Sequence, residues 1–367
     1  MPVVDDGKLK GIVTSRDFRY AENMESEVSS IMTSFEKLIT VKEGFSQKEV
    51  MKLMYKNRIE KILVLDNDKN LSGLVTMKDI EKSAQHPNAT KDSSGRLQVG
   101  AALGTSEDTI DRAKALFKSG VDVFVVDSAH GHSKNVIDTI KALKEKFRDV
   151  DIIGGNIATA EAATELVKAG ADAVKVGMGP GSICTTRIIA GIGVPQISAI
   201  LEIKKALVGR DINIIADGGI RFSGDIAKAI AAGADSVMLG SLFAGTEEAP
   251  GKVELFQGRS FKTYRGMGSI GAMTERDDAN RYLQEDIVTD KLVPEGIEGR
   301  VPYKGLVVNV INQLVGGVRQ SMGYIGCKNI KDMQNNSQFV EITNAGMAES
   351  HVHDVMITKE APNYQRS

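Results

Sequence analysis

The stretch DAVKVGMGPGSICTTR (172–187) opens with an apolar run and then turns, through closely spaced glycines, into a loop of small and hydroxylated residues. Similar apolar runs recur along the chain, each followed by a loop and an amphipathic helix, so we expect strands at 97–103, 121–127, 150–155, 172–177, 211–217 and 235–240. The helices are expected at 107–119, 133–147, 160–169, 198–207 and 222–232. This α/β pattern predicts a parallel sheet, either a barrel or a doubly wound sheet.

Polar and glycine-rich residues gather just after the C-terminal ends of these strands. They read DSAHGH (127–132), GGNIAT (154–159), GMGPGSICTTR (177–187), ADGGIR (216–221) and LGS (239–241). In a (β/α)8 TIM barrel, the loops at this end of the strands form the active face. A barrel needs eight strands and we count six, so we predict a TIM barrel of which this sequence contains six strands.

A repeat precedes the strand–helix pattern. Residues 3–17 read VVDDGKLKGIVTSRD and residues 64–79 read VLDNDKNLSGLVTMKD, at an offset of 62 residues. The second copy has a lead-in of strand (37–41), helix (45–57) and strand (61–66), which the first copy lacks. Each copy ends in a T-x-x-D pattern, Thr14/Asp17 and Thr76/Asp79, typical of a helix cap. The polar segment 86–96 then indicates a linker.

Composition excludes several classes of protein. The chain has 46 Lys and Arg against 48 Asp and Glu, a net charge of −2 that gives no electrostatic case for nucleic-acid binding. No apolar run reaches the roughly 18 residues of a membrane span, and no signal peptide opens the chain. Two cysteines in unrelated contexts argue against a disulfide framework. We therefore expect a soluble cytoplasmic protein.

Three features of the loops suggest chemistry. Cys184 lies among small and hydroxylated neighbours, which favours a nucleophilic thiol over a buried structural cysteine, and no histidine is close in sequence to make a cysteine protease. The glycine loops at 216–221 and 239–245 can hold a phosphate through backbone amides, or are simply tight turns. Asp217 is placed to bind ribose hydroxyls. Asp127 lies at the end of its strand, where it either contacts a bound ligand or caps the N-terminus of the next helix.

Taken together, these motifs resemble the inosine-5'-monophosphate (IMP) dehydrogenase family of bacterial type. The resemblance rests on GMGPGSICTTR (177–187), ADGGIR (216–221), MLGS (238–241), YRGMGS (264–269), NRY (280–282) and PEGIEGRVPYKG (294–305). The repeat resembles the family's paired cystathionine-β-synthase (CBS) modules, which are inserted into the barrel. We accordingly expect the tail of a truncated first CBS module at 1–20, a second module at 21–85 and a catalytic barrel at 86–367.

The resemblance implies an NAD-dependent oxidoreductase of purine biosynthesis, acting at the committed step toward guanine nucleotides (GMP). Cys184 would attack C2 of IMP, and hydride transfer to NAD+ would leave a thioimidate, E-XMP*. A flap at about 270–305 would then replace NADH. Arg281, aided by Tyr282, would activate the water that releases XMP, and Thr186 would help position that water. Composition alone reads 270–305 as a long segment without regular structure, either a mobile flap or a solvated loop.

The same resemblance implies the binding sites. IMP would be held by Ser182, Asp217, Gly219, Gly240, Ser241, Tyr264, Gly266, Met267, Gly268 and Glu295. The nicotinamide side would be lined by Asp127, Ser128, Asn156 and Gly177. A potassium ion (K+) would be bound by carbonyls of Gly179, Gly181 and Cys184, joined by Glu349, Ser350 and His351 of a neighbouring subunit. The family is tetrameric, so we expect a homotetramer or octamer.

Two alternatives stay open. GMP reductase shares the cysteine loop but, as a family, is expected to lack the CBS pair and the Arg-Tyr flap. A non-catalytic nucleotide sensor is the other, because CBS modules bind adenine nucleotides and the chain carries fewer than eight barrel strands.

Overall fold

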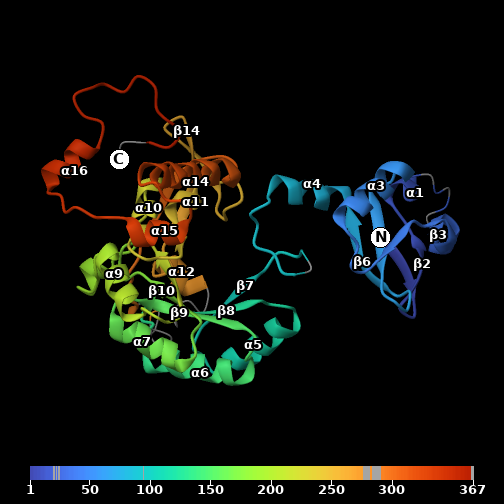
Figure 1. The fold of residues 1–367 in the computed structure, drawn as a ribbon, viewed down its shortest axis with the longest axis horizontal. Helices are drawn as coiled ribbons and strands as arrows, with labels where there is room; N and C mark the ends of the chain where they lie inside the picture. Colours follow the sequence, from blue (N-terminus) through green and yellow to red (C-terminus); the bar gives the residue numbers. More distant parts are fainter. Residues whose placement is uncertain are drawn as a thin grey trace. The chain divides into compact units, whose positions relative to one another are not determined.

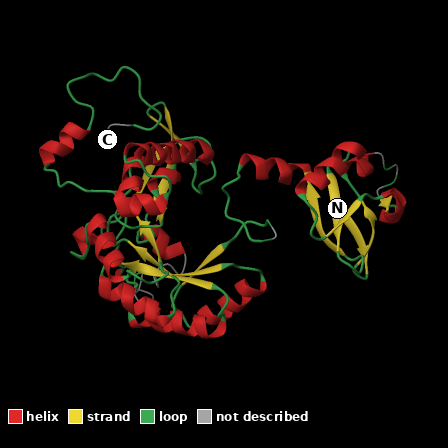
Figure 2. Cartoon of the chain, viewed as in Figure 1, coloured by secondary structure: helices red, strands yellow, loops and turns green. Residues whose placement is uncertain are grey.

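The computed structural model describes residues 1–19, 21, 23, 25–93, 95–275, 282 and 291–364 (Figure 1). The contacts divide the chain into two compact units, Met1–Gln98 and Val99–Ser367. Figure 2 shows strands and helices in both units. The narrower boundaries predicted for the CBS modules stay predictions.

The repeat seen in the sequence is a repeat in structure. In its first copy, β1 (Pro2–Asp5) and β2 (Lys8–Ile12) form an antiparallel hairpin that leads into helix α1 (Ser15–Arg19). In its second copy, β5 (Lys61–Leu65) and β6 (Leu71–Thr76) lead in the same way into α4 (Met77–Gln85). The pairing shifts register once in each hairpin, and the matching glycines lie in equivalent positions, Gly11 opposite Val3 and Gly73 opposite Val64.

Both T-x-x-D pairs form the expected local bonds. The Thr76 hydroxyl donates to Asp79 Oδ2 at 2.7 Å, and the backbone amides complete a capping box at the start of α4. In the first copy, the Thr14 hydroxyl donates to Asp17 Oδ2 at 2.8 Å. Hydrogen bonds from the hydroxyl and the backbone amide of Thr14 lower the pKa of Asp17, and the hydroxyl is the largest cause.

The lead-in to the second copy differs in part from the expectation. Helix α3 (Gln47–Asn57) is present, with α2 (Val28–Ile31) and β3 (Thr33–Ser34) before it. The strand predicted at 37–41 is wrong in its first half, because Phe35–Lys37 form a 3-10 helix and strand β4 spans only Thr40–Lys42. The strand begins where the chain pairs in parallel with β5, from Thr40 opposite Leu63.

The second unit is built on a parallel sheet. Among the described residues it has six strands: β7 (Gly100–Leu103), β8 (Val123–Asp127), β9 (Asp151–Ile157), β10 (Ala173–Val176), β11 (Asn213–Asp217) and β12 (Ser236–Met238). They follow one another across the sheet in sequence order, so every crossover leads to the adjacent strand. A doubly wound sheet would reverse direction part-way, so the order is that of an open portion of a (β/α)8 barrel.

A helix follows each of the first five strands. They are α5 (Thr109–Lys118), α6 (Lys134–Lys146), α7 (Ala160–Ala169), α9 (Gln196–Ala206) and α10 (Ser223–Ala231), with the short α8 (Thr186–Ile189) before α9. Figure 1 shows α5, α6 and α7 along one side of the strands. Fully buried side chains of the strands, such as Phe124, Ile152 and Val174, form one core with those of the helices, including Ile140 and Leu166.

The region after β12 adds a small antiparallel sheet and, after the last strand of that sheet, three helices in the described part of the chain. The sheet consists of β13 (Val253–Phe256), β14 (Arg259–Arg265) and β15 (Glu298–Pro302). The helices are α14 (Val307–Tyr324), α15 (Ile330–Asn336) and α16 (Asn344–Ser350). None of the helices in the described part of the chain combines the length and apolarity needed to cross a bilayer.

The expectation that 270–305 lacks regular structure is wrong at both ends. Ile270–Glu275 form helix α12, and Glu298–Pro302 form β15, which pairs with β14 along its whole length. The composition of the segment is polar, but residues 298–302 are extended because they pair with β14. A local sequence pattern does not reveal that pairing.

Candidate active site

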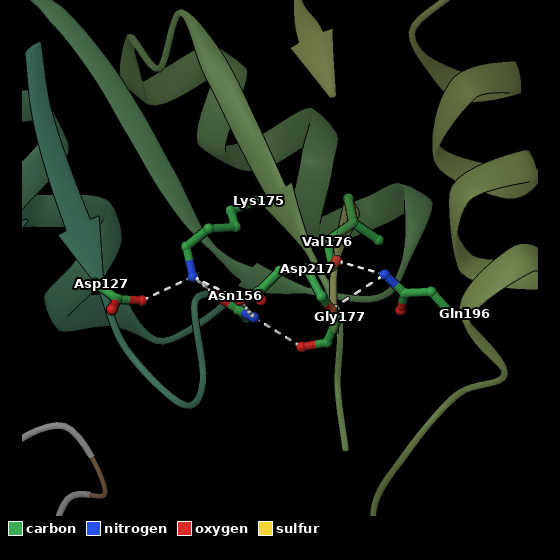
Figure 3. A network of polar contacts seen from close by, with 7 residues as sticks. All are labelled: Asp127, Asn156, Lys175, Val176, Gly177, Gln196 and Asp217. Carbon is green, nitrogen blue, oxygen red and sulfur yellow. Dashed lines mark hydrogen bonds and ion pairs between the residues drawn. The ribbon is translucent and has the colours of Figure 1, made fainter. Parts of the chain in front are cut away.

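Four side chains or loops predicted from sequence meet at the C-terminal edge of the parallel sheet. Asp127 ends β8, Asn156 lies near the end of β9, Gly177 follows β10 and Asp217 ends β11 (Figure 3). Parallel strands bring these positions to one edge, as the sequence predicted.

Lys175 also belongs to this group, which the sequence did not predict. Its ammonium group donates to Asp127 Oδ1 at 3.0 Å, to Asp217 Oδ2 at 3.1 Å and to the Asn156 side-chain oxygen (Figure 3). The residue is 1% exposed, so the charge has left water and is compensated by two carboxylates. The available signal was a lysine inside the otherwise apolar strand DAVKVG, which parallel strands covered on both faces rarely contain.

Asn156 and Gln196 fix the backbone around this charged group. The Asn156 amide donates to the Gly177 carbonyl and to Asp217 Oδ2, both at 2.9 Å. The Gln196 amide donates to the Val176 carbonyl at 2.8 Å and to the Asp217 carbonyl at 3.2 Å (Figure 3). A β-carbon on Gly177 would lie 2.0 Å from the Asp217 carbonyl oxygen, so the loop after β10 requires glycine there. Gln196, the first residue of α9, carried no sequence signal.

Cys184 lies at the start of a short chain of hydrogen bonds. Its thiol donates to the Thr186 hydroxyl oxygen at 3.2 Å, and that hydroxyl donates to Glu295 Oε2 at 2.7 Å. The backbones also meet: the Thr185 amide donates to the Glu295 carbonyl at 2.9 Å, and Cys184 forms a bridge with Gly296. The segment 294–297, more than a hundred residues downstream, therefore lies directly against the cysteine loop.

The residues assigned to phosphate binding also come together. The Ser182 hydroxyl hydrogen-bonds the Tyr264 phenol, and a β-carbon on Gly240 would lie 2.6 Å from that phenol oxygen. Burial raises the pKa of Tyr264, the Ser182 hydrogen bond opposes the rise and the Asp217 charge adds to it. Tyr264 is thus a neutral hydrogen-bonding group at ordinary pH, beside the first residue of α11 (Ser241–Ala244).

Glycines allow two loops to approach the cysteine loop. Gly218 and Gly219 have φ angles of +88° and +78°, and a β-carbon on either would lie 3.0 and 3.2 Å from Pro180. A β-carbon on Gly266 would lie 3.2 Å from the Ile183 carbonyl. The backbones of both loops therefore pack against the loop that carries the thiol, closer than side chains would permit.

The GMG turn of 266–268 contacts Tyr282. A β-carbon on Gly268 would lie 2.7 Å from the Tyr282 ring, and Met267 is 47% exposed. Arg281, assigned to water activation, lies outside the described residues.

A pocket opens where these elements meet. Its walls come from the loops after β8, β10 and β11, from the ends of β9 and β11, and from Tyr282. The lining residues are Ala129, Asn156, Gly177, Met178, Gly179, Pro180, Gly181, Cys184, Thr186, Asp217, Gly218 and Tyr282. The thiol, the ribose candidate Asp217 and the nicotinamide candidate Asn156 therefore share one pocket.

The residues assigned to potassium fall into two places. Gly179, Gly181 and Cys184 belong to the cysteine loop, where the Gly181 carbonyl accepts the Cys184 amide at 3.2 Å. Glu349 and Ser350 end α16, and the His351 ring packs against Phe222 and Tyr364 of its own chain. The His351 Nδ1 lies 3.0 Å from the Tyr364 hydroxyl.

Comparison with known proteins decides the family. The model of the "IMP dehydrogenase / GMP reductase domain" matches residues 23–353, and the CBS domain model matches residues 1–23. The chain belongs to the IMP dehydrogenase / GMP reductase family. The expected barrel class and the presence of a CBS region are thereby confirmed, and the six-stranded sheet is the family's barrel in part.

Curated members of the family named inosine-5'-monophosphate dehydrogenase match nearly the whole chain. The chain is 56% identical to the Haemophilus influenzae protein over 365 residues, 99% of this chain and 75% of that protein. It is 58% identical to the Aquifex aeolicus protein over 367 residues and 54% identical to the Escherichia coli K12 protein over 363, again 99% of this chain and 74% of each relative.

A solved structure that is similar to this chain is of a GMP reductase. The crystal structure of GMP reductase from Trypanosoma brucei, a cysteine-to-alanine variant in complex with guanosine 5'-monophosphate, matches with a TM-score of 0.84 and 46% identity. The match covers 96% of this chain and 72% of that one, so it takes in most of Met1–Gln98. The CBS region therefore does not separate the two activities within the family, contrary to the sequence-based expectation.

Proposed function

We propose that the chain is an IMP dehydrogenase, which oxidises IMP to XMP with NAD+. Identity above 50% to three curated IMP dehydrogenases, over nearly the whole chain, supports this reading. The single structural observation that supports it is a chain of two hydrogen bonds. The first joins Cys184 to Thr186, and the second joins Thr186 to Glu295. That arrangement joins a nucleophile to a carboxylate through a hydroxyl, which suits a reaction that first forms and then hydrolyses a covalent intermediate.

IMP would lie with its phosphate against the Ser182, Gly240 and Tyr264 cluster and its ribose at Asp217. Gly219 and Ser241 would complete the phosphate contacts, and the turn of 266–268 with Glu295 would face the base. In this pose the purine lies over the pocket that Cys184 lines. Positioning of the reacting atoms is the main contribution such contacts can make.

In the first step, the Cys184 thiol releases its proton to solvent and the sulfur bonds to C2 of the purine, while the electron pair of the C2–N3 double bond moves onto N3. The hydride then leaves C2, which restores the C2–N double bond as the E-XMP* thioimidate. NAD+ supplies the acceptor for that hydride. Asn156 and Gly177 line the same pocket as the thiol, so a nicotinamide ring held there, with Asp127 and Ser128 beside it, would lie next to C2.

In the second step, water adds to C2 and the carbon–sulfur bond breaks, which returns the thiol and releases XMP. The Thr186 hydroxyl would orient the water, and the Glu295 carboxylate, which already accepts the Thr186 proton, would draw a proton from it through that hydroxyl. Arg281 and Tyr282 keep their proposed role as partners in water activation when the flap closes.

A potassium ion bound by the cysteine loop is part of the proposal. Carbonyl oxygens are the ligands that a large monovalent cation takes. The Gly181 carbonyl accepts one amide and retains a second lone pair, which is compatible with such a role. Glu349, Ser350 and His351 of a neighbouring subunit would complete the shell, in a homotetramer or octamer.

The deciding assay offers the full chain IMP with NAD+ and, separately, GMP with NADPH, both with K+ present. NADH formation from the first pair supports the proposal, and NADPH oxidation by the second alone would replace it with the GMP reductase reading that the Trypanosoma structure favours. Calorimetry with ATP and IMP tests the sensor alternative, which requires ATP binding with no IMP binding.

A further inference from the structure

The chain contains a second buried lysine, away from the pocket. Lys262 lies in β14 and is 3% exposed. Its ammonium group donates to the Thr246 carbonyl at 2.7 Å, to the Glu247 carbonyl at 3.0 Å and to the Ala249 carbonyl. All three of its protons are thus used on neutral backbone oxygens, and within the described residues no carboxylate pairs with it.

These three carbonyls belong to the turn that follows α11 (Ser241–Ala244). Helix α11 packs against β14. Side chains two residues apart in a strand point to the same face, so Lys262 and Tyr264 both face this helix. Tyr264 contacts Gly240, immediately before α11, and Lys262 holds residues 246–249, immediately after it. Strand β14 therefore contacts the chain on both sides of one short helix.

We propose that Lys262 is a positioning residue for the phosphate end of IMP, and that it acts through α11. The inference rests on the proposed function, in which Gly240 and Ser241 bind the phosphate. Ser241 is five residues from Thr246, the nearest carbonyl that the ammonium group holds, and α11 connects the two, so a shift of 246–249 moves Ser241 away from Tyr264. A phosphate site loosened in this way loses affinity for IMP without losing the thiol or the hydride acceptor site.

Other bonds hold the same turn, which makes the effect local. The Lys304 amide donates to the Gly245 carbonyl and the Glu247 amide to the Gly305 carbonyl, both at 2.8 Å. The Tyr303 hydroxyl also donates to Glu247 Oε2 at 2.6 Å. A Lys262 variant keeps these contacts, so we expect it to fold with a displaced turn rather than to unfold.

The test compares Lys262→Met with Lys252→Met, which removes an exposed lysine next to β13 and serves as the matched control. For Lys262→Met we expect the KM for IMP to rise about tenfold, with kcat and the KM for NAD+ within about twofold of the parent. Lys252→Met should match the parent in all three. A Lys262→Met protein whose specific activity falls at an unchanged KM for IMP would overturn the proposal, because that pattern indicates a merely structural residue.

Chemical rescue gives a second readout. Lys262→Ala removes the three outer carbons and the ammonium group, a gap that propylammonium ions match. Propylammonium should lower the KM for IMP of Lys262→Ala toward that of the parent, whereas tetramethylammonium, which has no N–H donor, should not. Equal effects of the two ions would contradict the role of the ammonium donors. Absence of IMP turnover by the parent chain would instead refute the proposed function, so the two failures are distinguishable.

Discussion

The Thr186 hydroxyl lies between the Cys184 sulfur, at 3.2 Å, and a Glu295 oxygen, at 2.7 Å. Cys184 lies in the loop after β10 and Thr186 begins α8, whereas Glu295 lies in the segment that leads into β15. The segment that leads into β15 thus brings a carboxylate within one hydroxyl of the proposed nucleophile.

Glu295→Gln should separate the two chemical steps. The amide cannot take up a proton, so we expect hydrolysis of the Cys184 adduct to slow about tenfold or more, while the first NADH forms at the rate of the parent. Rapid mixing that follows NADH and XMP separately measures this. The control is Glu298→Gln. The Glu298 carboxylate accepts a hydrogen bond from the Gly271 amide and not from Thr186. Equal slowing of both steps would contradict the assignment.

Lys175→Met should leave two carboxylates, Asp127 and Asp217, without their shared cation. Removing one member of a buried ion group costs about 3–5 kcal/mol, so the free energy of unfolding should fall by that order. Adding Asp127→Asn should restore part of the loss, because one unpaired charge is removed. Urea unfolding of the single and double variants measures the coupling, and strictly additive losses would count against it.

Gly240→Ala should weaken IMP binding, because its new β-carbon would lie 2.6 Å from the Tyr264 phenol oxygen. Tyr264→Phe removes that oxygen, and with it a proposed phosphate contact. The double variant should therefore bind IMP no more weakly than Tyr264→Phe alone, since the clash is gone. Calorimetric titration with IMP measures the three affinities. A double variant that loses the sum of both effects would exclude direct contact.

Asp235 gives a prediction about acid stability. Burial raises the pKa of its carboxyl, but the Ile214 amide, Gln334 and Lys331 outweigh burial and leave the pKa below its ordinary value of 3.8. The lowered pKa contributes stability above pH 3.8 that is lost as the pH falls through the folded-state pKa. Asp235→Asn should therefore lower the free energy of unfolding by about 1–2 kcal/mol at pH 7. The difference should shrink in urea melts below pH 4, and a constant difference would contradict it.

Sequence alone predicted the parts of this fold that depend on local pattern. The six apolar runs became six strands in order, and the repeated hairpins of the first unit match residue for residue at Gly11 and Gly73. Glycine loops placed after parallel strands could be assigned to one edge, because topology alone brings them together.

Sequence did not predict contacts that depend on distant partners. Lys175 and Gln196 are bonded to groups from neighbouring strands, and no local pattern marks a lysine that will be buried between two aspartates. Strand β15 was missed for the same reason, because its polar sequence is extended only through pairing with β14. The CBS region was expected to distinguish IMP dehydrogenase from GMP reductase. It does not, because it also lies within the match to a GMP reductase.

The central claim is that Cys184 forms a covalent bond with the purine during oxidation of IMP. The most direct measurement is acid quenching of the full chain during turnover with IMP, NAD+ and K+, followed by mass spectrometry of its peptides. We expect an XMP-sized adduct on the peptide that contains Cys184, and none in Cys184→Ala. Turnover with no adduct on this peptide, or an adduct on Cys327 instead, would contradict it.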